Sequence, residues 1–174
     1  ERGGLRVTKI FIPSYHRAND LKTVYYLRKI GWEMQDVYVF LDSEADDIDK
    51  YEAAQREYGF HLEVFDMEEA RRRYDYVHRP SVSRRSVGQA RNMFQDFAKR
   101  EGIQNYCVMD DDTTGFQLKM KGVHVGMSRG GQVRRAIEEV AKFVEKHRIG
   151  LFGLPQSGDF YGSLKRNLWI RKVM

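Results

Sequence analysis

The segment Tyr106-Cys107-Val108-Met109-Asp110-Asp111-Asp112 joins a short apolar run directly to three consecutive aspartates. A short apolar run that stops at polar residues is typical of a buried strand followed by a loop. Adjacent carboxylates raise each other's pKa unless a cation compensates their charge. The segment therefore predicts a strand whose carboxyl end carries a loop suited to a cation.

Before this segment, apolar runs alternate with stretches of helical periodicity. This alternation predicts βαβ units, a mostly parallel sheet and an α/β fold. Asn19 or Asp20 is expected to cap the first helix, and Gly31, Gly59 and Gly102 are expected to end the first three helices. The predicted strands are 7–13, 37–41, 61–65 and 106–109, and the predicted helices are 21–30, 46–58 and 87–98.

After Asp112 the pattern predicts a hairpin over 116–127, a helix over 132–147, a strand over 149–154 and a loop over 155–162. The sequence contains no internal repeat, linker or low-complexity segment, so we expect 1–174 to be a single domain. It begins at Glu1 without a methionine or a signal peptide. We therefore expect it to be a processed or truncated piece of a longer protein.

The amino-acid composition indicates a globular protein without membrane spans or disulfide bonds. Apolar residues make up 41% of the chain and charged residues 32%, a globular balance. No apolar run approaches the ~20 residues of a membrane span, so no membrane partner is expected. The single cysteine, Cys107, excludes a disulfide framework and favours a reducing, intracellular compartment. We expect Cys107 to be a buried strand residue.

The net charge of +5 permits a polyanionic partner. Basic residues concentrate between Arg71 and Arg100, where aromatic residues are interleaved with them. Such a mixture suits contacts with phosphates and stacking on bases, although a solvated helix face has the same composition. The candidate nucleic-acid contacts are Tyr74, Tyr76, Arg79, Arg84 and Arg85.

Polar residues follow three of the predicted strands, at 14–17, 42–43 and 110–112. In open parallel sheets, ligands bind at the carboxyl ends of the strands. Carboxylate oxygens suit Mg²⁺ or Mn²⁺, and Asp110 and Asp112 can both face one ion if the chain turns after the strand. An acidic turn that caps a helix is the alternative interpretation.

Two further motifs carry candidate ligand contacts. In Gly88-Gln89-Ala90-Arg91-Asn92, Arg91 can reach back to the strand ends and contact a diphosphate, or be an exposed helical arginine. Pro13-Ser14-Tyr15-His16-Arg17 offers a hydroxyl, a ring and a base for a nucleotide. Neither a dinucleotide-binding nor a P-loop glycine motif occurs, and the histidines lack zinc-site spacing.

In this order, the motifs resemble those of GT-A glycosyltransferases related to family 2, over roughly residues 7–115. Within that superfamily, 83–92 followed by Met109 and the three aspartates is most similar to the TET/JBP-associated group. That group includes the base J glucosyltransferase of kinetoplastids and phage enzymes that glycosylate hydroxymethylated pyrimidines, such as hydroxymethyluracil, in DNA. The resemblance implies a Rossmann-like, three-layer α/β sandwich.

The resemblance also implies roles for individual residues. Pro13, Ser14, Tyr15 and Arg17 would border the uridine pocket, and Asp42 would contact the base or ribose. Gly88, Arg91 and Asn92 would belong to the donor site, with Arg91 on the diphosphate. In the D-x-D motif, Asp110 would reach the ribose or sugar, Asp112 would bind the metal, and Asp111 would support either. Residues 7–115 would form the donor part and 116–174 an acceptor part, which would be incomplete if the chain is truncated.

The implied activity is metal-dependent transfer of a hexose from a UDP-sugar, with UDP-glucose favoured, Mn²⁺ or Mg²⁺ as cofactor, and hydroxymethylpyrimidine in DNA as acceptor. Asp159 is the candidate general base, with a structural aspartate in a turn as its alternative. The location would be the cytoplasm of an infected bacterium, or a eukaryotic nucleus. Other hypotheses are a saccharide or protein acceptor, and a non-catalytic nucleic-acid-binding module, which would have little use for the acidic triplet.

Overall fold

The computed structural model describes residues 8–73, 87–120 and 123–150. Four parallel strands form its main sheet in the order β3-β2-β1-β4. They are β1 (Lys9–Ser14), β2 (Val37–Asp42), β3 (His61–Phe65) and β4 (Tyr106–Val108). Because β1 lies between β2 and β4, the loops that follow these three strands leave the sheet side by side.

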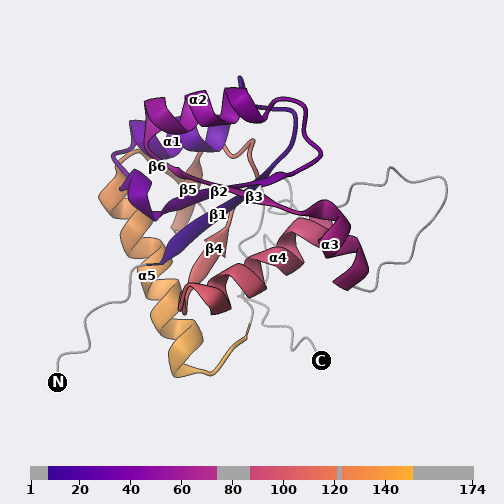
Figure 1. Cartoon of the computed structure of the whole chain (residues 1–174). Coiled ribbons are helices and arrows are strands. Elements are labelled where there is room, and N and C mark those ends of the chain that lie inside the picture. Colours follow the sequence, from indigo (N-terminus) through magenta and orange to yellow (C-terminus); the bar gives the residue numbers. More distant parts are fainter. Residues whose placement is uncertain (1–7, 74–86, 121–122, 151–174) are drawn as a thin grey trace.

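Helices cover both faces of this sheet (Figure 1). The helices α1 (Lys22–Lys29), α2 (Ile48–Tyr58) and α5 (Gly130–Lys146) pack on one face, and α3 (Met67–Arg73) and α4 (Val87–Arg100) on the other. A short 3₁₀ turn, η1 (Met34–Asp36), leads into β2. The result is the predicted three-layer α/β sandwich of Rossmann-like form.

Strand β1 shows how the sequence fills the two cores. Ile10 and Ile12 point to the face covered by α1, α2 and α5, whereas Phe11 points to the opposite face. This alternation is the two-residue period of a strand that is buried on both sides. Phe11 stacks on Tyr106 and makes tilted or edge contacts with several other rings. Each such fully buried apolar side chain contributes roughly 1.5–3 kcal/mol.

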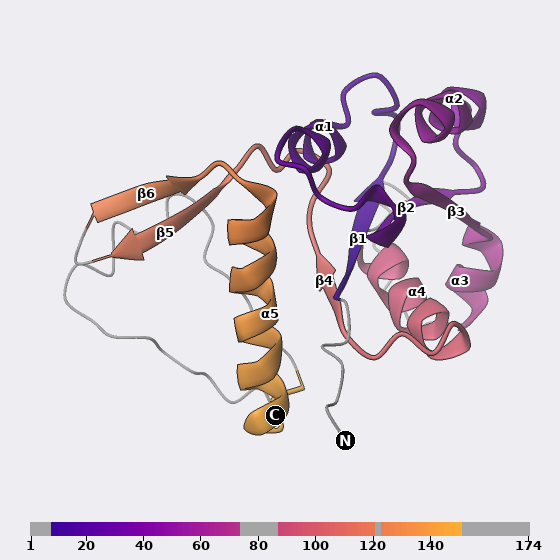
Figure 2. The same cartoon turned by 90° about the vertical axis from the view of Figure 1, so that its left-hand side faces the viewer.

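A separate antiparallel hairpin consists of β5 (Phe116–Met120) and β6 (Val123–Met127). Figure 2 shows it beside α5. The Tyr26 hydroxyl donates to the Met127 carbonyl at 3.0 Å and so ties the hairpin to α1. Gly130 donates its N–H to the Ile30 carbonyl, and a side chain at this position would collide with that carbonyl oxygen. The start of α5 is thus packed closely on the end of α1.

Most predicted elements are confirmed within one or two residues, including the turn glycines Gly31, Gly59 and Gly102, which all have positive φ. One expectation about the helices was wrong, and one helix was not predicted. Helix α1 begins at Lys22 without a side-chain cap, because the Asp111 carbonyl accepts the Thr23 N–H instead of Asn19 or Asp20. Helix α3 was not predicted, and only its last three residues belong to the basic segment that begins at Arg71. Of the strand expected at 149–154, all but the first two residues lie outside the described part.

Cys107 is only half-buried, since β4 is an edge strand in the described part of the sheet. Burial nevertheless raises the pKa of its thiol to about 11. Among the described helices, none is long and apolar enough to cross a membrane.

Candidate functional site

The loop that follows β4 is anchored to the start of α1 by a buried threonine. The Thr23 hydroxyl donates to the Asp110 carbonyl at 2.5 Å and accepts the Thr113 N–H at 2.8 Å. The Thr23 N–H, an otherwise unpaired donor of the first helical turn, donates to the Asp111 carbonyl at 3.1 Å. One side chain therefore fixes the backbone of the three aspartates, which we call the acidic run (Asp110–Asp112).

The middle carboxylate of the acidic run points inward. Asp111 accepts hydrogen bonds from the Ser14 hydroxyl at 2.9 Å and from the Arg17 guanidinium at 2.9 Å. Burial raises the pKa of Asp111 and outweighs these two contacts, which lower it. The Tyr51 hydroxyl lies 2.8 Å from that of Ser14 and accepts the Arg17 N–H at 3.0 Å. Tyr51, fully buried on α2, therefore holds both partners of Asp111.

The two outer carboxylates are more exposed and face arginines. Arg91 on α4 donates to Asp110 at 3.1 Å, and Arg17 lies 3.7 Å from Asp112. Asp110 and Asp112 offer two carboxylate ligands on one turned loop. Mg²⁺ and Mn²⁺ are typically bound by one or two carboxylates, and substrate phosphates supply further oxygen ligands. The donor set therefore fits the expected ion, provided that the arginines change partners.

Asp42, at the end of β2, is buried and lies on the same edge of the sheet. One carboxylate oxygen accepts the Glu44 N–H at 2.7 Å, and the other, Oδ2, has no hydrogen bond within the described part of the chain. Burial raises the pKa of this carboxyl group. A buried oxygen without a partner is uncommon and points to a missing donor, such as a bound ligand.

The family model of TET-associated glycosyltransferases matches residues 8–164, which is most of the chain. The chain belongs to this family. No curated protein matches it. Membership makes it a transferase, and a glycosyltransferase of this kind implies a nucleotide-sugar donor.

In this TET-associated glycosyltransferase, the predicted residues at the ends of β1 and β4 come together. Ser14 and Arg17 reach Asp111, and Arg91 reaches Asp110. Pro13 and Tyr15 flank Ser14 and are half-buried, and Gly88 and Asn92 lie on α4 on either side of Ala90 and Arg91. Six predicted residues lie outside the described part: Tyr74, Tyr76, Arg79, Arg84, Arg85 and Asp159.

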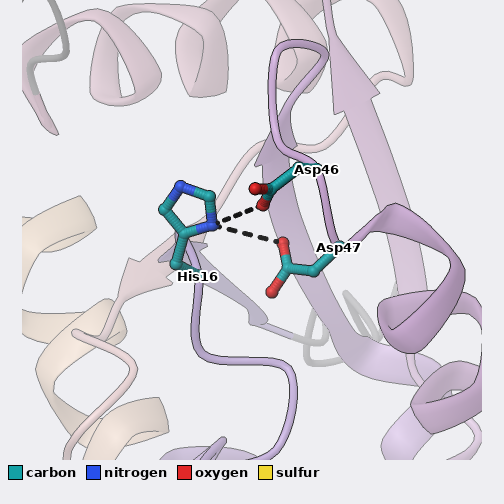
Figure 3. A group of neighbouring side chains, drawn as sticks. All are labelled: His16, Asp46 and Asp47. Carbon is teal, nitrogen blue, oxygen red and sulfur yellow. Dashed lines mark ion pairs between the residues drawn. The ribbon is translucent and has the colours of Figure 1, made fainter.

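The sequence did not single out the buried groups that hold the site, Thr23 and Tyr51. Both look like ordinary members of an amphipathic helix, and only their tertiary contacts distinguish them. It also missed a second group of polar side chains at this edge, His16, Asp46 and Asp47 (Figure 3). His16 Nδ1 lies 2.9 Å from Asp46 Oδ1 and 3.7 Å from Asp47 Oδ1. We call this group the histidine cluster.

Proposed function

We propose that this TET-associated glycosyltransferase transfers a hexose, with glucose favoured, from a UDP-sugar to the hydroxyl of a 5-hydroxymethylpyrimidine in DNA, and that it requires Mn²⁺ or Mg²⁺. The observation that carries the donor half is the pairing of Arg17 and Arg91 with the acidic run. The proposed enzyme works inside the cell, where its DNA acceptor is found.

The pairing matters because a metal–diphosphate complex presents both signs of charge. Asp110 and Asp112 would bind the cation, while Arg17 and Arg91 would turn to the phosphate oxygens, for which guanidinium groups are suited. The carboxylates and guanidiniums that now neutralise each other would then neutralise the ligand. Asp111 would keep its hydrogen bond from the Ser14 hydroxyl and so hold the loop in place.

In the proposed reaction, the acceptor hydroxyl oxygen forms a bond to the anomeric carbon of the sugar. The bond between that carbon and the β-phosphate oxygen breaks, and UDP departs with its electron pair. The hydroxyl proton passes to a general base, for which Asp159 is the candidate. The metal, when bound, supplies Lewis-acid stabilisation of the departing diphosphate. Arg17 and Arg91 would add positive charge at the same oxygens.

The DNA acceptor is supported by the family and by charge. The TET/JBP-associated enzymes that the sequence resembles act on hydroxymethylated pyrimidines in DNA. The net charge of +5 favours a polyanionic substrate. A pyrimidine within a duplex must leave the base stack before its hydroxymethyl group can be reached, so single-stranded or mismatched DNA should be the better acceptor.

The donor half is tested by calorimetric titration of UDP-glucose with and without Mn²⁺. We expect binding that requires Mn²⁺, that is lost in Asp112→Asn, and that persists in Glu52→Gln, which neutralises an exposed carboxylate on α2. Binding that is unchanged in Asp112→Asn would refute the assigned metal site. A folded protein that binds no uridine nucleotide would refute the donor.

The acceptor half is tested with radiolabelled UDP-glucose and three acceptors. They are an oligonucleotide with 5-hydroxymethyluracil, the same oligonucleotide with thymine, and a simple saccharide. We expect label only on the hydroxymethylated DNA, because thymine lacks the nucleophilic hydroxyl. If only the saccharide became labelled, the acceptor would be a saccharide and not DNA. The assignment of the UDP-glucose donor would still hold.

A further inference from the structure

We propose that the histidine cluster is a second cation site, for a borderline divalent ion such as Zn²⁺, which the acidic run and the proposed transfer reaction do not require. Within the described residues, it is the only group of three metal-ligating side chains whose candidate ligand atoms all lie within 4.8 Å of one another. Its members come from two loops, the one after β1 and the one between β2 and α2.

The geometry of the cluster suits one ion bound by three protein ligands. Zinc–nitrogen and zinc–oxygen bonds of about 2.1 Å in a tetrahedral site place neighbouring ligand atoms roughly 3.4 Å apart. The separations of His16 Nδ1 from Asp46 Oδ1 and Asp47 Oδ1, 2.9 and 3.7 Å, bracket that value. Figure 3 shows both carboxylates turned toward the same ring nitrogen.

The side chain of Asp47 gives independent evidence for a missing ligand. The Asp47 side chain is only 12% exposed, and its Oδ1 atom makes no hydrogen bond in the described structure. Asp47 also occupies the position before the first turn of α2, where an aspartate normally accepts a helix N–H, yet its side chain makes no such cap. The buried Oδ1 atom therefore accepts neither a hydrogen bond from another side chain nor one from a helix N–H, and it faces an imidazole nitrogen. A bound cation would explain this position.

An ion pair between His16 and the two aspartates does not explain this arrangement. At 3.7 Å, His16 and Asp47 form an ion pair but no hydrogen bond, so a proton on His16 Nδ1 would be donated to Asp46 and would leave Asp47 Oδ1 without a donor. In the described part of the chain, neither aspartate makes an ion pair with a lysine or arginine. One divalent ion, by contrast, satisfies the imidazole and both carboxylates together.

The ligand set also indicates which ion would bind. Imidazole nitrogen suits Zn²⁺, Co²⁺ and similar transition metals, whereas Mg²⁺ and Ca²⁺ prefer oxygen donors alone. Asp46 is 84% exposed and His16 41%, so an ion can enter from solvent and keep water in its open position. Because His16 adjoins Arg17, a bound ion would also fasten the loop that carries Arg17 to the start of α2.

The experiment uses Asp112→Asn as its background, so that ions bound by the acidic run do not contribute. Co²⁺ is titrated without nucleotide, and its visible absorption reports coordination by the protein. We expect one equivalent to bind. Replacing a ligand should lower the affinity at least roughly tenfold, since even residues that only support metal ligands cost that much. The test variants are His16→Asn and Asp47→Asn, and His147→Asn is the matched histidine control.

Asparagine is chosen at position 16 because His16 has a φ of +54°, which asparagine tolerates better than most residues. Zn²⁺-induced shifts of imidazole ¹⁵N resonances give a second measurement that needs no variant at the site, and we expect His16 Nδ1 to move most. The proposal is overturned if the folded background protein binds no Co²⁺, or if His16→Asn binds it as tightly. Neither result bears on UDP-glucose binding by the wild-type protein.

Discussion

Two groups of acidic side chains lie at the same edge of the sheet, and they differ in what neutralises them. The acidic run is held by two arginines and a serine hydroxyl, whereas the aspartates of the histidine cluster face an imidazole. Arginine stays charged at any relevant pH, so it can change partners but cannot become a ligand. Imidazole can bind a metal directly.

Because of this difference, we expect the two groups to respond differently to an added metal ion. A metal ion that approaches the acidic run must displace guanidinium groups, and a diphosphate that arrives with it gives those groups a new partner. Metal and nucleotide should therefore bind there cooperatively. At the histidine cluster no arginine has to move, so an ion should bind alone.

The largest expected effect comes from Arg91→Ala. Loss of a charge-assisted contact to phosphate, worth about 1.5–3 kcal/mol, should weaken Mn²⁺-dependent UDP binding roughly 10- to 100-fold. Binding of Mn²⁺ alone should strengthen, because Asp110 loses its competing cation. Calorimetry with metal alone and with metal plus UDP measures both changes.

The control for Arg91→Ala is Lys99→Ala, an exposed cation near the other end of α4. It should change neither affinity. Co²⁺ affinity of the histidine cluster should also stay constant in Arg91→Ala. If Mn²⁺ alone binds more weakly to Arg91→Ala than to the wild type, competition between arginine and metal is wrong, and Arg91 helps to build the metal site instead.

The next effect comes from Tyr51→Phe, which removes one hydroxyl. Its loss leaves the buried Ser14 hydroxyl and the Arg17 N–H each without one partner, at a cost of about 1–3 kcal/mol in the free energy of unfolding. Since Ser14 and Arg17 hold Asp111, Mn²⁺-dependent UDP binding should weaken as well. Urea unfolding and calorimetry give the two values.

Tyr106→Phe serves as the comparison for Tyr51→Phe. This half-buried tyrosine stacks on Phe11 in the opposite core, and its hydroxyl makes no hydrogen bond with the described residues. Its removal should leave both stability and UDP affinity nearly unchanged. Equal losses in the two variants would show that Tyr51 contributes only packing.

The sequence predicted the architecture well, because the architecture depends on periodic patterns. Apolar strands, helical spacing and turn glycines are local signals, and they placed β1 to β4 within one or two residues. The position of the acidic run after β4 then followed from chain order and from the common direction of parallel strands. The same reasoning brought Ser14, Arg17 and Arg91 to that edge.

What the sequence could not give were contacts between residues distant along the chain. Thr23 and Asp110 are 87 positions apart, and Ser14 and Tyr51 are 37 apart. The missing cap of α1 has the same cause, because its acceptor is a backbone carbonyl of the acidic run. The histidine cluster joins two loops with no fixed ligand spacing, so no sequence motif reveals it.

A smaller effect is expected from Asp42→Asn. In the wild type, the Asp42 carboxylate makes no ion pair with a described residue. Burial raises its pKa in the folded protein above the unfolded value of about 3.9, so the fold favours the protonated form. That contribution to stability is present at low pH and is lost as the pH rises through the folded pKa. The neutral variant should therefore be more stable at pH 7, by less than about 1 kcal/mol because the bond from Glu44 weakens.

Thermal unfolding of Asp42→Asn and wild type between pH 7 and pH 3 measures this difference. The advantage of the variant should shrink as the pH falls and vanish once the wild-type carboxyl group is protonated in both states. Asp49→Asn, an exposed carboxylate on α2, should show no such trend. An advantage that grows toward low pH would reverse the assigned direction of the Asp42 pKa.

The smallest effect is expected from Asp46→Asn in metal-free protein. The Asp46 side chain is 84% exposed, and exposed ion pairs contribute about 0–1 kcal/mol because solvent screens them. Unfolding in a chelator should therefore hardly distinguish the variant from wild type, whereas Zn²⁺ should stabilise wild type more than Asp46→Asn. A loss of stability that is equally large with and without Zn²⁺ would mean that the pair with His16 holds the two loops by itself. The histidine cluster would then resemble the acidic run, in which side chains of opposite charge satisfy one another and an ion has to compete for them.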